Sequence, residues 1–225
     1  MGYEGYARYG VYWCPDTDLA EAGAQWLGWD LYARAKRSVE APADDMVATP
    51  RRYGFHATLK APFRLAEGHA PGDLDAAVAA LAARLRPVVL PGLTIDASLG
   101  FLALRPTEQT ADLDTLAGAC VRELDAHRAP LNEAERARRK ASGLDAAALE
   151  RLERWGYPSV FEHFRFHLTL SRRLTDAEVS PVLDRAKAHF GRFLGAPVTL
   201  GALSLVGDPG EGAPFHHLAS HALSG

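Results

Sequence analysis

The chain has 225 residues, 48% of them hydrophobic and 24% charged, with 25 Lys and Arg against 28 Asp and Glu. This composition supports a globular core and excludes a disordered tail, a collagen-like repeat and a disulfide scaffold. The net charge of −3 argues against a long nucleic-acid track, because such tracks usually have a basic face.

Further features bear on the cellular environment. No apolar run approaches the roughly 18 residues needed to cross a bilayer, and residues 1–10 lack the charged start and apolar stretch of a secretory signal. The two cysteines, Cys14 and Cys120, have apolar neighbours. This is typical of buried thiols in a reducing compartment rather than of a disulfide or a zinc site. We therefore expect a cytoplasmic protein without membrane segments.

The spacing of apolar residues predicts a mixture of strands and helices. Strands are expected over residues 9–13, 88–97, 101–105, 164–170, 198–206 and 215–223. Helices are expected from Asp16 or Thr17 to Trp26, over 74–85, over 113–124, within 131–155, and from Thr175 to Phe193. Thr175 and Glu178 have capping-box spacing. Residues 37–50 are polar and contain prolines, so they predict a loop.

The predicted helical segment 131–155 contains a basic cluster, Arg136, Arg138, Arg139 and Lys140. Two interpretations stay open for it. The cluster is either a solvated helix face or a lid that attracts anions over a site.

The main feature of the sequence is an internal repeat. Phe55-His-Ala-Thr-Leu59 and Phe166-His-Leu-Thr-Leu170 share one pattern. His167 follows His56 by 111 residues, Arg173 follows Arg64 by 109, and Pro197 follows Pro87 by 110. Since each copy mixes strands with a helix, the repeat predicts an α+β fold. We expect two similar lobes of antiparallel sheet with helices on the outer faces and a cleft between them, forming one bilobal domain over 1–225.

Side chains alternate along a strand, so each motif has an apolar and a polar face. In the first motif Phe55, Ala57 and Leu59 are expected to face the core, and His56, Thr58 and Lys60 to face outward. In the second, the outward residues are His163, Arg165, His167 and Thr169, and the core residues are Phe164, Phe166, Leu168 and Leu170. Two His-Thr pairs would then converge on one cleft.

Two imidazoles across a cleft suit general acid–base catalysis of a displacement. A neutral one takes a proton from the attacking water or hydroxyl, and a protonated one gives a proton to the departing oxygen. The threonine hydroxyls can donate hydrogen bonds to phosphoryl oxygens. Lys60, Arg165 and Arg52 are candidates for supplying positive charge nearby. This chemistry requires no metal or other cofactor.

His56-Ala-Thr-Leu59 and His167-Leu-Thr-Leu170 resemble the paired His-x-Thr/Ser-hydrophobic signature of the 2H phosphoesterases. The segments 52–65, 99–106 and 155–158 are similar to a DUF1045-type family labelled as phosphonate-metabolism proteins. The resemblance implies a bilobal 2H fold and metal-independent opening or hydrolysis of a cyclic phosphodiester. It assigns catalysis to His56, Thr58, His167 and Thr169, and it suggests a small cyclic phosphate substrate, such as a ribosyl cyclic phosphate.

Three alternatives remain open. The same residues would serve an enzyme acting on 2′,3′-cyclic or 2′–5′-linked RNA ends, with Tyr53, Trp155 and Tyr157 either stacking on a base or packing at the rim. A non-catalytic binder of a phosphorylated ligand would use the same cleft. A metal protein is disfavoured, because His163 and His167 are about 13 Å apart on an extended strand.

The other histidines are assigned from their context. His163, His216 and His217 are candidates for lining the cleft, and the last two lie close to His221 in the sequence. His69, His127 and His189 fall in predicted loops or helices, where we expect them to be solvated or bonded locally.

Overall fold

The computed structural model describes residues 2–38, 44–140 and 143–225, without the side chains of 138–140. The helices are α1 (Asp18–Leu27), α2 (Asp44–Tyr53), α3 (Pro71–Ala82), α4 (Ala111–Glu123), α5 (Glu133–Lys140), α6 (Ala146–Trp155) and α7 (Asp176–Phe190). The strands are β1 (Arg8–Trp13), β2 (Trp29–Asp30), β3 (Ala35–Lys36), β4 (Ala57–Phe63), β5 (Val88–Leu90), β6 (Leu93–Asp96), β7 (Phe101–Pro106), β8 (Leu168–Arg173), β9 (Val198–Leu200), β10 (Ala202–Asp208) and β11 (His216–Ala222). Over these ranges no helix combines the length and apolar character needed to span a bilayer.

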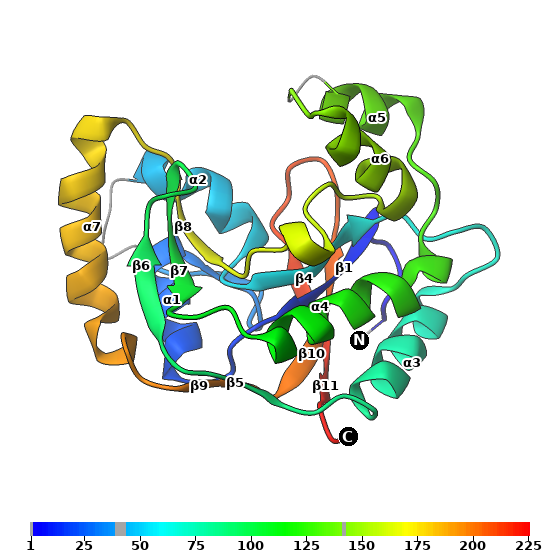
Figure 1. Ribbon diagram of the computed structural model, residues 1–225, viewed down its shortest axis with the longest axis horizontal. Helices are drawn as coiled ribbons and strands as arrows, with labels where there is room; N and C mark the ends of the chain where they lie inside the picture. The colour runs from blue at the N-terminus through cyan, green and yellow to red at the C-terminus, as the bar shows by residue number, and fades with distance from the viewer. Residues whose placement is uncertain (1, 39–43, 141–142) are drawn as a thin grey trace.

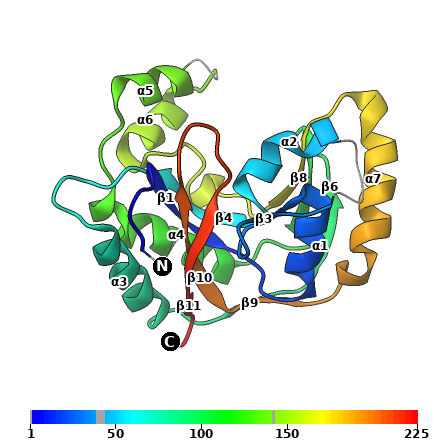
Figure 2. The same cartoon turned by 180° about the vertical axis from the view of Figure 1, so that it is seen from behind.

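Seven strands form one antiparallel sheet in the order β11-β10-β1-β4-β8-β7-β6. Its two halves, β11-β10-β1-β4 and β8-β7-β6, join through the pair Ala57 and Leu168. Helices α3 and α4 lie along the first half, and α1 and α7 along the second (Figures 1 and 2). In the upper part of the view in Figure 1, α2 lies beside β8 of the second half, and α5 and α6 lie on the side of the first half. The predicted pair of antiparallel lobes is confirmed.

The two lobes exchange strands. β1 and β7 occupy equivalent positions beside the two motif strands. Tyr12 of β1 pairs with Thr58 of β4, and Ala103 of β7 pairs with Thr169 of β8. Beyond β1 lies β10, and beyond β7 lies β6. Each lobe therefore contains two strands from the other copy of the sequence repeat, β10 and β11 in the lobe of β4, and β6 and β7 in the lobe of β8. The two segments that lead from one lobe to the other contain β5 and β9, and these strands pair in a small ladder in which Val89 lies opposite Thr199.

Some predicted element boundaries were wrong. The expected strands 88–97 and 198–206 are each divided, because Pro91-Gly92 and Gly201 interrupt the ladders between β5 and β6 and between β9 and β10. The second motif enters its strand only at Leu168, since a 3₁₀ turn, Phe161–His163, precedes it.

The expected loop over 37–50 was also wrong in part, because α2 begins at Asp44; residues 39–43 lie outside the described chain. This helix buries only Val47 and Pro50, so it has no apolar stripe that would predict it. Asp44 and Asp45 in its first turn and Arg51 and Arg52 in its last complement the helix dipole.

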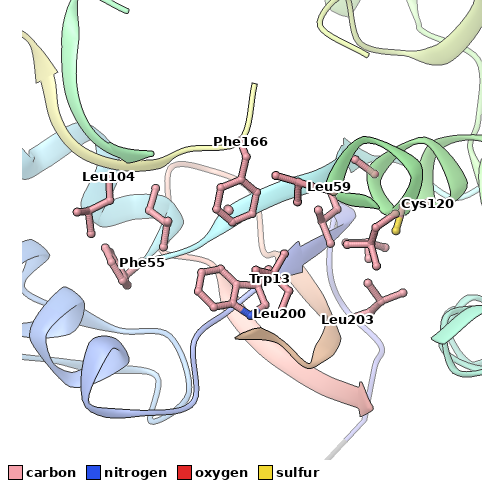
Figure 3. Packing of buried hydrophobic residues seen from close by; sticks show 14 of the residues in the cluster. Trp13, Phe55, Leu59, Leu104, Cys120, Phe166, Leu200 and Leu203 are labelled. Carbon is pink, nitrogen blue, oxygen red and sulfur yellow. The ribbon is translucent and has the colours of Figure 1, made fainter. Parts of the chain in front are cut away.

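The core lies between the sheet and the helices that cover it. Trp13, Phe55 and Phe166 meet there with leucines from strands of both lobes (Figure 3). The inward residues predicted for both motifs are buried, each with at most 8% of its surface exposed. Cys14 and Cys120 are buried and unpaired, and burial raises the pKa of each thiol to about 12. The predicted alternation of the two motif strands is therefore confirmed for the core face.

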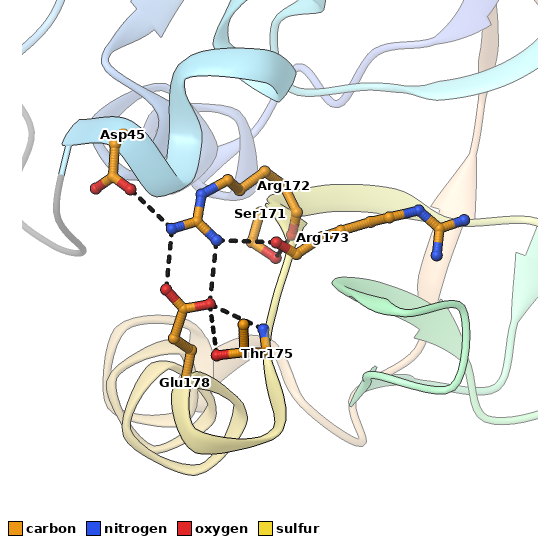
Figure 4. A network of polar contacts seen from close by, with 6 residues as sticks. All are labelled: Asp45, Ser171, Arg172, Arg173, Thr175 and Glu178. Carbon is orange, nitrogen blue, oxygen red and sulfur yellow. Dashed lines mark hydrogen bonds and ion pairs between the residues drawn. The ribbon is translucent and has the colours of Figure 1, made fainter.

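A polar network fixes α2 beside the start of α7 (Figure 4). The Arg172 guanidinium donates to Asp45 at 2.7 Å and to Glu178 at 2.9 and 3.1 Å. Glu178 also accepts the Thr175 backbone N–H at 2.8 Å, which is the predicted capping contact. These contacts, with Arg172 contributing most, lower the pKa of Glu178 to about 2. The second motif strand thus anchors the helix that was missed from the sequence.

We predict that Gly23→Ala destabilises the protein by about 1–3 kcal/mol through overpacking. A Cβ at position 23 would lie 2.0 Å from Cγ of Phe55, a rigid ring stacked on Phe190. The measurement is urea unfolding. Gly72→Ala is the matched control, because a Cβ added to that helical glycine would have no atom within 4 Å, and we expect it to be neutral or slightly stabilising. Equal effects at both positions would contradict the packing argument.

Candidate active site

The join between the lobes brings the two motifs together. Because Ala57 pairs antiparallel with Leu168, extending the register by one residue places His56 opposite Thr169 and Thr58 opposite His167. Side chains at such positions are about 5 Å apart at Cβ. All four line one cavity of about 510 Å³. The predicted convergence of the two His-Thr pairs is therefore what the structure shows.

Each imidazole is oriented by a backbone carbonyl two residues earlier. Nδ1 of His56 lies 2.9 Å from the Gly54 oxygen, and Nδ1 of His167 lies 2.7 Å from the Arg165 oxygen. A carbonyl only accepts, so Nδ1 carries the proton in both rings and Nε2 is the basic nitrogen of the neutral form. Nε2 of His56 is 3.1 Å from Oγ1 of Thr58, whose hydroxyl donates to it.

His56 lies against an aromatic wall. The Tyr12 ring stacks on it with centroids 3.8 Å apart, and Phe215 stacks behind Tyr12 at 6.4 Å. This burial, reinforced by the positive charge of a protonated His167, lowers the pKa of His56 to about 4. Burial also lowers the pKa of His167, whose ring contacts Phe101 at 5.6 Å. Both imidazoles are therefore predominantly neutral at pH 7 in the free protein.

Lys60 is absent from the lining of the cavity that contains His56 and Thr58, so the predicted outward face of the first motif does not extend to it; it lines a second cavity that adjoins the first. Tyr12 pairs with Thr58 and Val11 with Lys60, which leaves Leu59 as an extra residue in β4. The bulge turns the Lys60 side chain toward α4, because it reverses the alternation beyond it. There Nζ donates to the Val121 carbonyl at 2.9 Å and to Asp125 at 3.1 Å, and the side chain is buried.

The other predicted binding residues divide between two cavities. Arg52 and Tyr53, at the end of α2, line the same cavity as the four motif residues. Arg165 and His163 line an adjoining cavity of about 480 Å³ instead. Arg165 donates to the Glu162 and Phe164 carbonyls at 2.8 and 2.7 Å, and His163 lies 3.2 Å from Glu162. The polar ends of these two side chains therefore contact adjacent residues of their own segment rather than the imidazole pair.

The adjoining cavity is rich in aromatic side chains. Trp155, Phe161 and Phe101 line it, and Trp155 meets Phe161 edge to face at 5.1 Å. Thr58, Tyr157 and His167 line both cavities. An aromatic chamber therefore opens beside the second imidazole.

His216 and His217, two candidates for the cleft, are absent from the lining of the cavity that contains the four motif residues. Both lie on β11 at the sheet edge, where each imidazole contacts a hydroxyl outside that cavity. His216 Nδ1 is 3.1 Å from the Tyr6 hydroxyl, and His217 Nε2 is 2.8 Å from the Ser220 hydroxyl. Burial, with Arg34 nearby, lowers the pKa of His217 to about 4.

His69, His127 and His189, which we expected to be solvated or bonded locally, each contact a polar group close to them in the fold. Nδ1 of His69 lies 3.0 Å from Nδ1 of His127, and Nε2 of His189 lies 2.8 Å from the Ala22 carbonyl oxygen. Within the described ranges, no group of three or more His, Cys, Asp or Glu side chains is arranged to hold a metal ion.

In the basic cluster on α5, Arg136 donates to Glu153 of α6 at 2.7 Å. The side chains of Arg138, Arg139 and Lys140 lie outside the described part of the chain.

Sequence reasoning missed Arg8, Tyr12 and Asp208. Arg8 and Tyr12 line the cavity, and Asp208 is a buried carboxylate that binds Arg8 and Arg52. The alternation of β1 was a usable signal, since Arg8, Gly10 and Tyr12 share one strand face. Asp208 offered no such signal, because it reaches the site only through Arg8 and Arg52, which lie far from it in the sequence.

A family model described as "Protein of unknown function (DUF1045)" matches residues 58–216. Two curated relatives carry the name "Ribose 1,5-bisphosphate phosphokinase PhnN". The protein of Janthinobacterium sp. (strain Marseille) is 37% identical over 94% of this chain, and that of Laribacter hongkongensis (strain HLHK9) is 39% identical over 92%. The chain spans about half the length of each relative, 50% in both cases.

Solved structures of Escherichia coli LigT share the fold. The complex with 3′-AMP superposes with a TM-score of 0.51 at 16% identity, covering 99% of this chain and 100% of LigT. The complex with NADP⁺ gives a TM-score of 0.52 at 16% identity and the same coverage. The bilobal α+β fold expected from the two motifs is thereby confirmed, and it is the fold of LigT.

We predict that the His56 imidazole titrates with a pKa of about 4 and carries its neutral-form proton on Nδ1. The unfolded chain titrates near 6.5, so between these values it binds more protons than the folded protein. Stability therefore falls as the pH is lowered from 7 toward 4. NMR titration of the imidazoles tests the pKa and the tautomer. Urea unfolding of His56→Gln, which should lose this part of the pH dependence, is the control; a His56 pKa at or above 6.5 would contradict the burial argument.

Proposed function

Because the chain belongs to the DUF1045 family and has the 2H phosphoesterase fold, we propose that it is a phosphodiesterase that opens or hydrolyses a small cyclic phosphodiester without a metal. The observation that carries this proposal is the single cavity lined by His56, Thr58, His167 and Thr169. Two imidazoles with Nδ1 bonded to backbone carbonyls present two Nε2 atoms for proton transfer. That arrangement supplies both halves of an acid–base pair.

The reaction would proceed by proton transfer at the two Nε2 atoms. One neutral imidazole takes a proton from water as the water oxygen bonds to phosphorus. The other, protonated, donates to the ring oxygen as its bond to phosphorus breaks. The low pKa of His56 suits it to the base role. The negative charge of a bound phosphodiester raises the pKa of a facing imidazole, which favours His167 as the acid. Thr58 would turn its hydroxyl from Nε2 of His56 to a non-bridging oxygen when the substrate binds, which frees Nε2 as the base, and Thr169 would donate to the other non-bridging oxygen.

The substrate we favour is a ribosyl cyclic phosphate from phosphonate breakdown. The curated relatives are named for a kinase of ribose 1,5-bisphosphate, and opening a ribose 1,2-cyclic phosphate at O2 leaves a 1-phosphate. A ring-opening step of this kind would create the 1-phosphate group that the substrate named in those relatives carries. This relation between the name and the product supports the assignment of a small sugar phosphate.

A second candidate substrate is an RNA end with a 2′,3′-cyclic phosphate or a 2′–5′ linkage. The aromatic chamber of Trp155, Phe161 and Phe101 beside His167 favours it, because base stacking on aromatic side chains is the usual mode of single-strand recognition.

We predict that His56→Ala and His167→Ala each lower kcat by at least about 10²-fold, since each removes one proton-transfer group. Thr58→Val and Thr169→Val should cost less, about 10-fold, because each removes one hydrogen bond to a phosphoryl oxygen. Steady-state hydrolysis of cyclic phosphates measures all four. His69→Ala and Thr199→Val, on residues outside the cavity lining, are the matched controls and should retain wild-type rates.

Exhaustive chelation should leave turnover unchanged, because both protons move through imidazoles. Turnover that survives in both histidine variants would refute the acid–base role and favour a phosphate-binding protein instead.

Trp155→Ala should separate the two substrate classes. If a nucleobase stacks in the chamber, the variant loses about 10-fold or more in kcat/KM for nucleoside 2′,3′-cyclic phosphates, as stacking is worth about 1–3 kcal/mol per base. For ribose 1,2-cyclic phosphate, which has no base, we expect kcat/KM within about 3-fold of wild type. Assaying both compounds with both proteins makes the comparison internal. Higher wild-type kcat/KM for the nucleoside, with its loss in Trp155→Ala, would favour the RNA-end enzyme.

A further inference from the structure

The catalytic cavity contains a second polar cluster that the acid–base reaction does not use. Arg8 of β1 and Arg52 of α2 line the cavity together with the imidazole pair. Both guanidinium groups bind the carboxylate of Asp208, the last residue of β10, which is 1% exposed. The cluster therefore joins three elements at one wall of the site.

The Asp208 carboxylate is saturated with donors. Arg8 donates to Oδ2 through Nε at 3.0 Å and a terminal nitrogen at 2.6 Å. Arg52 donates to Oδ1 at 3.2 Å, and the Gly210 N–H donates to the same oxygen at 2.9 Å. Four donors fill the acceptor capacity of a carboxylate. No further guanidinium N–H can be satisfied by Asp208.

The guanidinium groups, in contrast, retain donors. Nε of Arg52 donates to the Ala213 carbonyl at 3.3 Å. Within the described ranges, the second terminal nitrogen of each guanidinium group has no acceptor. Glu135 of α5 is close enough for Arg8 to lower its pKa. However, its oxygens already accept from Arg64 at 3.1 and 3.3 Å and from the Asn132 N–H at 2.9 Å.

The cluster is rigid and positively charged. The Arg52 guanidinium lies over the rings of Tyr53 and Phe215, 5.7 and 5.8 Å from their centroids. Asp208 separates two cations that would otherwise repel, and it leaves one net positive charge. Two planar forks held in place with free N–H groups match the geometry of a phosphate, which arginine binds through paired hydrogen bonds.

The cluster is displaced from the imidazole pair along β1. Tyr12 pairs with Thr58, and Arg8 lies four residues away, about 13 Å of strand. When a phosphoryl group is bound at the imidazoles, the two arginines therefore remain available to bind another anionic group of the same substrate molecule. We propose that Arg8 and Arg52, held by Asp208, form a subsite for a terminal phosphate monoester of the substrate. This assignment rests on the proposed function for the position of the cyclic phosphate.

The test compares ribose 1,2-cyclic phosphate with and without a 5-phosphate. Arg8→Gln and Arg52→Gln should each lower kcat/KM for the 5-phosphorylated compound by about 10- to 100-fold, the usual effect of losing hydrogen bonds to a charged group. For the compound without the 5-phosphate they should stay within about 3-fold of wild type. Arg37→Gln is the matched control, since Arg37 also pairs with an aspartate, Asp30, but outside this cavity.

A binding measurement separates the subsite from the reaction. Ribose 5-phosphate has no cyclic ester, so calorimetric titration into the His56→Ala/His167→Ala protein reports on the subsite alone. We expect binding that is lost on adding Arg52→Gln and partly kept with Arg52→Lys, which preserves the charge but not the fork. Thermal unfolding checks that Asp208, left with fewer partners, does not unfold the variants.

The two failures are distinct. If the wild-type protein turns over neither cyclic compound but the arginine substitutions still abolish binding of ribose 5-phosphate, the proposed function is wrong and the subsite stands. If the arginine variants affect both cyclic compounds equally, the arginines serve the scissile phosphate and the subsite proposal is overturned. Binding of ribose 5-phosphate that is unchanged by Arg52→Gln overturns it as well.

Discussion

The site depends on one backbone contact, the pairing of Ala57 with Leu168 where the two lobes join. Both side chains are fully buried, so their flanking residues face the opposite side of the sheet, toward the cavity. A slip of one residue in this register would reverse the faces of one strand relative to the other, so that one of the two histidines would turn into the core and apolar residues of its strand would be exposed. Neither lobe contains both histidines. The imidazole pair is therefore a property of the join rather than of either sequence motif.

Burial does two things to the imidazoles at this join. It lowers both pKa values, since a charged ring is poorly solvated against Tyr12 and Phe101. It also makes the carbonyl contacts of Nδ1 decisive for the tautomer, because buried donors must be paired. The resulting neutral bases acquire a proton most readily when an anion enters. The anionic substrate proposed above would therefore favour protonation of an imidazole, although the chain as a whole has a net charge of −3.

The sequence predicted the parts of the molecule that follow a period or a repeat. Alternation along the motifs identified the core face and the outward His56, Thr58, His167 and Thr169. It failed at Lys60, where a bulge in β4 reverses the faces, because an inserted residue leaves no mark in the local pattern. It also missed α2, because this helix buries only Val47 and Pro50 and so has no apolar stripe in its sequence. The exchanged strands were hidden because an offset between repeats does not say which lobe each strand joins.

The exchange of the strand pairs β6–β7 and β10–β11 between lobes bears on how the site can vary. Each lobe is hydrogen-bonded to a strand of the other repeat, so the lobes cannot separate without breaking a ladder, and the imidazoles are held at a fixed spacing. The groups proposed for recognition have looser attachments. Arg52 and Tyr53 lie at the end of α2, which is held to the sheet by polar contacts, and Trp155 ends α6. Changes in these peripheral helices would alter the size and charge of the substrate while leaving the β4–β8 join intact. The architecture therefore separates the imidazole pair proposed for proton transfer, which is held by the sheet, from the helices that carry the groups proposed for binding.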